Sequence, residues 1–231
     1  MLQSDLVGHL YREFDSYDIK KTVTSEVRNW LRDLGFIKRE DEKMIVFVSG
    51  GGTCRCAMAK AMTKKIIERT PLNFKLRVES CARFNTTSKG GTPENPDDGA
   101  TNGARLSIKK LFGEDLLALA NHRSMILTNS IMEEADLILL MDDGLSKGIK
   151  DNPKTSEKTE VFKRFFGLEG DIKDPYGKDG GKNETEAQRH ERYERYDKCA
   201  KEIKEVLELE DSFEKIINFL TKGKNSKYVM T

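Results

Sequence analysis

The stretch that most constrains the fold is MIVFVSGGGTCRCAMAKAM, residues 44–62. It passes from a short apolar run, residues 44–48, through a glycine-rich turn into a segment in which Met58 and Met62 share one helical face. A strand, a tight turn and a helix in this order are typical of the first unit of an open α/β sheet. Such a unit places the turn at the carboxyl edge of the sheet, where these folds bind ligands.

The rest of the chain continues the alternation of strands and helices. Further apolar segments predict an α/β fold, a small doubly wound parallel sheet of about four strands with helices on both faces and the phosphate loop after the first strand. The expected elements are strands at 74–80, 135–141 and 160–166, a long loop at 81–103, a helix in two pieces around Gly113, a long helix opened by a capping box of Asn183 with Glu186, and a last helix at 212–220.

Three parts of the chain differ in character. Residues 1–43 carry two amphipathic helical patterns, the second ending at Gly35, and are expected to form an N-terminal helical extension. Residues 44–222 hold the alternating strands and helices and are expected to form one domain. Residues 223–231 are a basic tail.

Composition excludes several classes of function. Forty basic residues against 39 acidic ones leave a net charge of +1, which gives no electrostatic argument for nucleic acid. No run approaches the roughly 20 apolar residues that cross a bilayer, and no signal-peptide pattern is present, so we expect a cytoplasmic protein without a membrane partner. The four cysteines include a Cys54-x-Cys56 pair, a poor zinc pattern, so we expect no metal, no cofactor and no disulfide framework.

The glycine-rich turn is a candidate anion site. Successive backbone N–H groups before a helix form a concavity for phosphate, and Arg55 adds a planar guanidinium fork. A Walker loop requires Gly-Lys-Ser/Thr, and a dinucleotide fingerprint a third glycine, and the turn has neither. Its GGGTCR is close to the loop of sugar nucleotidyltransferases, which stays open as an alternative. The candidate phosphate-binding residues are Gly50, Gly51, Gly52, Thr53, Cys54, Arg55 and Cys56.

Three motifs in order resemble the low-molecular-weight protein phosphatases. The family signature after the first strand, C-x-x-x-x-x-R-S/T, matches SGGGTCRC except at its first and last positions, Ser49 and Cys56. A histidine segment beginning at His122 leads into a buried strand that ends in Met-Asp, and the late DPYG carries an Asp-Pro pair. The resemblance covers roughly residues 44–220.

The resemblance implies a mechanism and roles for single residues. The nucleophile position attacks phosphorus, Arg55 and the loop amides hold the phosphoryl oxygens, and Asp174 protonates the leaving group before it activates water on the phospho-enzyme. The implied substrate is a phosphorylated protein, with phosphate or another oxyanion in the loop and no cofactor. Gly52 stands where the family often has Asn in a left-handed conformation, and Cys56 replaces a Ser or Thr that hydrogen-bonds the nucleophile.

Ser49 contradicts the chemistry that the other positions imply. A cysteine thiol at a helix N-terminus beside an arginine is largely ionised, whereas a serine hydroxyl there stays protonated. We therefore expect this chain to bind phosphate and to turn over poorly. Ser49 is either an engineered Cys-to-Ser replacement or the native residue of a pseudophosphatase that binds phosphoproteins. Because Arg55 and Asp174 are both retained, we favour the engineered replacement.

Two side chains bear on the substrate. Tyr176, beside Asp174, is expected to form an aromatic wall for a flat phosphorylated group. Thr53 resembles the phosphoarginine phosphatases of the family, whose tyrosine phosphatases commonly have an aliphatic residue there. Family prevalence favours phosphotyrosine over phosphoarginine.

Overall fold

The computed structural model describes residues 42–84, 99–176 and 184–221. Its strands form one parallel sheet in the order β3-β2-β1-β4-β5. The strands are β1 (Glu42–Ser49), β2 (Lys75–Ala82), β3 (Met125–Ile126), β4 (Leu137–Leu140) and β5 (Thr159–Val161). The helices are α3 (Arg55–Ile67), α4 (Asn102–Phe112), α5 (Leu117–Ala120), α6 (Asn129–Glu134), α7 (Phe162–Phe165), α8 (Glu186–Leu207) and α9 (Ser212–Thr221), with short 3₁₀ turns η3 (Asp143–Leu145) and η4 (Ser156–Lys158).

The strand order confirms the doubly wound sheet. The chain runs outward from β1 to β2 and β3 and then crosses back to β4 and β5 on the other side of β1. Because crossovers between parallel strands are right-handed, the two halves place their helices on opposite faces. The reversal lies between β1 and β4, so the loop after β1 stands at the topological switch point, where such sheets bind ligands.

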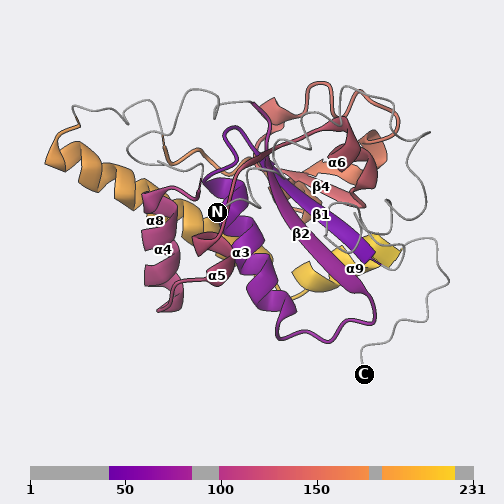
Figure 1. Ribbon diagram of the computed structural model, residues 1–231, viewed down its shortest axis with the longest axis horizontal. Helices are drawn as coiled ribbons and strands as arrows, with labels where there is room; N and C mark the ends of the chain where they lie inside the picture. The colour runs from indigo at the N-terminus through magenta and orange to yellow at the C-terminus, as the bar shows by residue number, and fades with distance from the viewer. Residues whose placement is uncertain (1–41, 85–98, 177–183, 222–231) are drawn as a thin grey trace, which may run out of the picture.

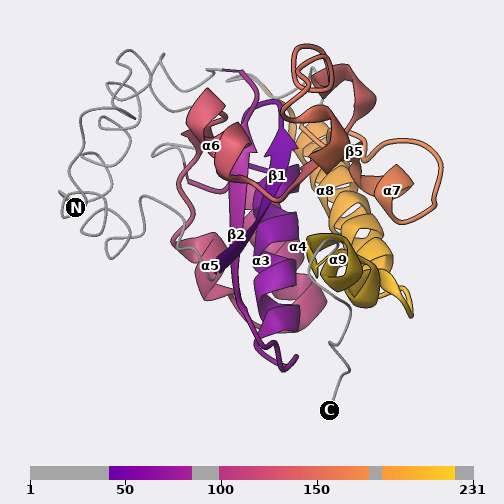
Figure 2. The same ribbon diagram turned by 90° about the vertical axis from the view of Figure 1, so that its right-hand side faces the viewer.

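The central strands are buried on both faces. From Met44 to Val48 every residue of β1 is at most 1% exposed, and the four residues of β4 are fully buried. Such continuous apolar strands are typical of a parallel sheet that helices cover on both sides. In Figure 1, α8 lies beside α3 and α4, and Figure 2 shows α9 next to the end of α8.

The structure corrects several expected boundaries. The sheet has a fifth strand, β3, which is too short to give an alternating pattern. The segment expected as a strand at 160–166 is a strand only to Val161 and then turns into α7. The expected loop at 81–103 is shorter, because β2 extends to Ala82 and α4 begins at Asn102.

The chain ends of the domain also differ from the expectation. Strand β1 begins at Glu42, so the last two residues of the expected helical extension are part of the sheet. Helix α8 has a capping box, but Thr185 and Gln188 form it. Asn183 lies outside the described residues, as do residues 1–41 of the extension and the tail at 223–231.

Close packing joins α4 to α8 at Gly103. A Cβ atom added there would lie 2.5 Å from the ring of Tyr196, which is fully buried in α8. Gly103 is the only glycine in α4, and α8 contains none. The approach of the two helices therefore depends on the missing side chain at Gly103.

We predict that Gly103→Ala destabilises the domain. In an exposed helix the change would stabilise by about 1 kcal/mol, whereas the clash with the Tyr196 ring is expected to give a net loss of about 1–3 kcal/mol. Urea unfolding measures the difference, and Asn102→Ala, at the exposed neighbouring position, serves as the control. A gain of stability in Gly103→Ala would contradict this packing.

Candidate functional site

The loop between β1 and α3 is held from outside through its carbonyl groups. The backbone N–H of Arg83 donates to Ser49 O at 2.8 Å, that of Phe84 to Gly50 O at 3.0 Å, and that of Thr101 to Thr53 O at 3.0 Å. Because the loop accepts these three hydrogen bonds through its carbonyl groups, its own backbone N–H groups are not used in them. Amides before a helix N-terminus form an anion-binding concavity, which fits the predicted phosphate loop.

Gly52 occupies the position in the loop that tolerates no side chain. Its φ angle of 72° lies in the left-handed region that glycine adopts without strain. An added Cβ would lie 2.2 Å from Ser124 Oγ and 2.9 Å from Ala82. The left-handed conformation expected at this position is confirmed, and here the surrounding side chains require glycine.

Two side chains from the segment before β3 support the same turn. His122 Nε2 lies 2.7 Å from Gly52 O, and Ser124 Oγ donates to Gly51 O at 3.0 Å. A carbonyl can only accept, so Nε2 carries the proton, and Nδ1 faces Ser80 Oγ at 3.4 Å. His122 is 2% exposed, and burial, together with the charge of Lys60, lowers its pKa to about 4. The imidazole is therefore neutral at neutral pH and acts as a fixed donor to the loop.

Arg55 is the centre of a network that joins three distant segments. Its Nη1 donates to Asp142 Oδ2 at 2.6 Å and to Ile172 O at 2.8 Å, and its Nη2 lies 3.5 Å from Asp174 Oδ2. Arg55 as a whole residue is 5% exposed. Charge-assisted bonds of this kind fix its orientation beside the loop.

The structure brings Asp174 to Arg55, as the sequence predicts. Its carboxylate is half exposed, lies 3.5 Å from Arg55 Nη2 and accepts the backbone N–H of Tyr176 at 3.1 Å. This placement suits an acid that protonates a departing group. Tyr176 lies beside it and is partly buried, but its role as a substrate wall remains a prediction.

Asp142 is the site residue that sequence reasoning missed. It comes shortly after the buried strand β4, and its carboxylate pairs with Arg55, which follows the neighbouring strand β1. The strand that ends in Met-Asp carried the signal for it. Only the register of β4 against β1 places this carboxylate next to the arginine.

Ser49 contacts a thiol. Its hydroxyl donates to Cys56 Sγ at 3.0 Å, and Ser49 is 3% exposed. Burial raises the pKa of both Cys56 and Cys54, so each is a neutral thiol at neutral pH. Cys56 also lies 3.7 Å from Cys81 O. Neither thiol is therefore an ionised base that could activate the Ser49 hydroxyl.

In residues 42–84, 99–176 and 184–221, no group of three His, Cys, Asp or Glu side chains is placed to hold a metal ion. Over the same ranges, no helix has the length and apolar character that crossing a membrane requires. The candidate site is the loop between β1 and α3 together with Arg55 and Asp174.

Comparison with known proteins gives the same assignment. Residues 44–209 match the family model described as low molecular weight phosphotyrosine protein phosphatase. The protein-arginine-phosphatase of Bacillus subtilis (strain 168) is 35% identical over 135 residues, which are 58% of this chain and 79% of that protein.

The solved structures that share this fold include a tyrosine phosphatase and an arginine phosphatase. The low molecular weight protein tyrosine phosphatase from T. tengcongensis is 26% identical, with a TM-score of 0.55 over 76% of this chain and 98% of its own. A cysteine-to-serine mutant of the YwlE arginine phosphatase, with its active-site serine phosphorylated, is 29% identical, with a TM-score of 0.55 over 78% of this chain and 97% of its own.

His122 is expected to make stability depend on pH. Its pKa is 6.5 when unperturbed and about 4 in the folded protein, so between these values the unfolded chain binds the additional proton. The stabilisation is complete above pH 6.5 and is lost as the pH falls toward 4, by about 2 kcal/mol between pH 7.5 and pH 5. Urea unfolding at the two pH values measures the loss.

Two histidine variants separate this effect from general acid unfolding. His122→Asn is expected to remove most of the loss between the two pH values, because no group with a depressed pKa remains at that position. His190→Asn, at an exposed site on α8, is expected to keep it. An unchanged pH dependence in His122→Asn would show that the buried imidazole is not its source.

Proposed function

The chain belongs to the low molecular weight phosphotyrosine protein phosphatase family, and on that premise we propose that it acts on phosphorylated arginine side chains of proteins. The observation that carries the proposal is the phosphate loop with Arg55 held between Asp142 and Asp174. Preference for phosphoarginine is supported by the protein-arginine-phosphatase relative and by Thr53 in the loop. Phosphotyrosine, which family prevalence favoured, becomes the second candidate.

Binding would use the loop and its arginine together. The amides of Gly50 to Cys54 and the guanidinium of Arg55 would hold the phosphoryl oxygens, and Thr53 would lie at the rim. Because Arg55 is already fixed by two carboxylates and a carbonyl, little conformational freedom is lost when the anion arrives. Tyr176 would contact the flat guanidinium or phenol behind the phosphoryl group.

Transfer to Ser49 would form one bond and break another. The Ser49 Oγ–P bond forms while the bond from phosphorus to the substrate nitrogen or oxygen breaks, with the proton of Asp174 passing to the leaving group and the hydroxyl proton to solvent. The phosphorylated active-site serine of the YwlE mutant supports this step. A serine phosphate releases an alkoxide, a far poorer leaving group than a thiolate, so the intermediate should persist.

The contact between Ser49 and Cys56 bears on the origin of the serine. The family signature has Cys at its first position and Ser or Thr at its last, whereas this chain has Ser49 and Cys56. The Oγ atom of Ser49 and the Sγ atom of Cys56 lie 3.0 Å apart. A single engineered Cys-to-Ser change would leave a hydroxyl at position 56. The double exchange therefore favours a native serine over the engineered replacement that the sequence first suggested. The chain would then bind and retain a phosphoryl group with slow turnover.

The nucleotidyltransferase alternative has less support. It rests on the GGGTCR stretch alone, whereas the phosphatase family model matches residues 44–209. Nucleotide-dependent turnover without phosphatase activity in a cysteine variant would revive it.

Restoring the usual residue order should restore turnover. We expect Ser49→Cys to hydrolyse phosphoarginine at least about a hundredfold faster than the unchanged chain, because the thiolate is both nucleophile and leaving group. Ser49→Cys with Cys56→Ser should be faster still, by about tenfold, because a hydroxyl is the stronger donor to the thiolate. Assays on phosphoarginine and phosphotyrosine peptides side by side measure rate and preference together.

The results of these assays distinguish a phosphatase from a phosphoprotein-binding module. Cys56→Ser alone serves as the matched control and should remain as slow as the unchanged chain. A folded double variant without activity on either substrate would identify a phosphoprotein-binding module. Higher activity on phosphotyrosine would keep the phosphatase and reject the arginine preference.

The unchanged chain should trap a phosphoryl group on Ser49. Incubation with a phosphoarginine peptide is expected to add the mass of one phosphoryl group, which peptide mass spectrometry assigns to residue 49. Ser49→Ala and Arg55→Ala are expected to remain unmodified, the first without an acceptor and the second without the phosphate-binding arginine. Equal labelling of Ser49→Ala would place the acceptor elsewhere.

A further inference from the structure

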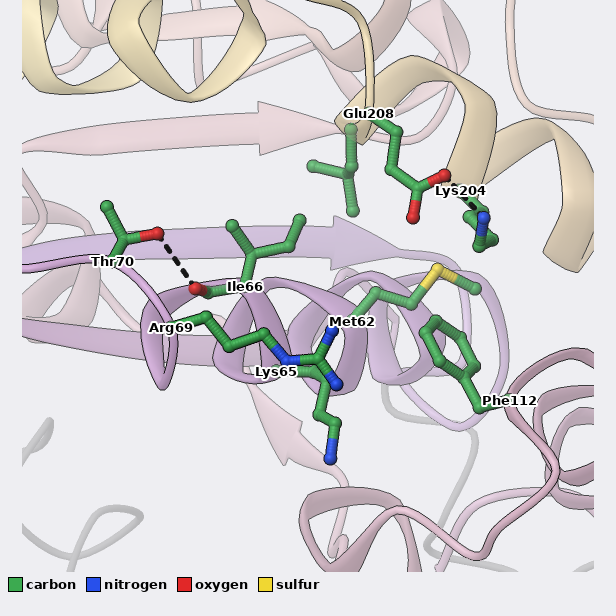
Figure 3. A pocket seen from close by; sticks show the side chains of 9 residues that line it. Met62, Lys65, Ile66, Arg69, Thr70, Phe112, Lys204 and Glu208 are labelled. Atoms are coloured by element: carbon green, nitrogen blue, oxygen red, sulfur yellow. Dashed lines mark hydrogen bonds and ion pairs between the residues drawn. The ribbon is translucent and has the colours of Figure 1, made fainter.

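A small cavity lies at the end of α3 opposite to the phosphate loop. Its volume is about 180 Å³, and it opens between the last turns of α3, α4 and α8 (Figure 3). A helix of this length places its two ends roughly 18 Å apart, so the cavity is separate from the site at Arg55. The lining residues are Met62, Lys65, Ile66, Arg69, Thr70, Phe112, Lys204, Leu207 and Glu208.

The floor of the cavity is apolar. Met62 and Leu207 are buried, and Ile66 and Phe112 are partly buried and pack against the core. In Figure 3 the Phe112 ring faces the thioether of Met62 across the cavity. An apolar cavity of about 150 Å³ is known to take a benzene ring, so this one has room for a single ring or a short chain.

The rim of the cavity carries charged groups, most of which have partners. Lys65 pairs with Glu114 at 2.7 Å, and Lys204 pairs with Glu208 on the following turn. Arg69 is exposed, and within the described residues its guanidinium has no hydrogen bond or ion pair. Its charge contributes to the lowered pKa of Glu114, but the main cause there is the ion pair of Glu114 with Lys65. Figure 3 shows the Arg69 side chain extending along α3 toward the cavity.

Arg69 is not needed to close the helix end. The hydroxyl of Thr70 donates to Ile66 O at 2.9 Å, and its backbone N–H donates to Ile67 O at 3.0 Å. The last carbonyls of α3 are thus satisfied locally. A planar guanidinium that lacks a carboxylate, placed over an apolar hollow, complements an anion with an apolar body.

We propose that this cavity binds a small amphipathic carboxylate. Its aromatic or short aliphatic body lies between Met62, Ile66, Phe112 and Leu207, and its carboxylate forms a bidentate pair with Arg69. The lining carries three cations against the single carboxylate of Glu208, which favours an anionic ligand over a neutral or cationic one.

The test is a titration of the full chain with benzoate, followed by NMR at the Met62 and Ile66 methyl groups. Benzoate is expected to shift both signals saturably in the millimolar range, whereas benzamide, without the charge, and acetate, without the ring, bind more weakly. Arg69→Gln is expected to weaken benzoate binding about tenfold. Arg105→Gln removes another exposed arginine, on α4, and is expected to leave benzoate binding unchanged.

Several results would overturn the proposal. Benzamide binding as tightly as benzoate, or equal affinity in Arg69→Gln and the unchanged chain, would remove the role of the guanidinium. Shifts confined to the phosphate loop and reversed by inorganic phosphate would place benzoate in the other site. Ile66→Phe fills the floor and should abolish the shift of the Met62 methyl signal, which this variant retains; if it fails to fold, the exposed Arg69 position still decides the question.

Discussion

The buried guanidinium of Arg55 is the constraint on which the arrangement of the site depends. A charge on a residue that is 5% exposed is costly unless it is paired, and its partners come from the ends of β4 and from the late loop at residues 172–174. Segments more than 80 residues away in the chain are therefore drawn to the first residue of α3. The same bonds that offset the burial of the charge also fix the orientation of the guanidinium beside the loop.

The other side of the loop is held by close packing around Gly52 and by a hydrogen bond from His122. Gly52 leaves room for Ser124 and Ala82, and the neutral imidazole of His122 donates to its carbonyl. A protonated imidazole could still donate, but its burial among Lys60 and apolar groups makes that charge costly. Loop geometry and folding stability are thus linked through one buried side chain.

Much of this arrangement could be predicted from the sequence, because it depends on patterns formed by residues close together in the chain. The run from Met44 to Val48 and the helix after Arg55 follow from hydrophobic periodicity, and the motif at Asp174 marked the second carboxylate. Strand β3 could not be predicted, because two residues carry no period and pair only through the register with β2. Asp142 was missed for a related reason, since its partner is set by the pairing of β4 with β1.

The exchange of Ser49 and Cys56 keeps the contact but changes its chemistry. The hydroxyl is now the donor and the thiol the acceptor at 3.0 Å, in surroundings where burial keeps the thiol neutral. Sulfur is a weak acceptor, so the bond holds the Ser49 oxygen in place without drawing away its proton. In the function proposed above, the loop would therefore surround a neutral hydroxyl at Ser49, and it would stabilise the phosphorylated serine more than the free hydroxyl.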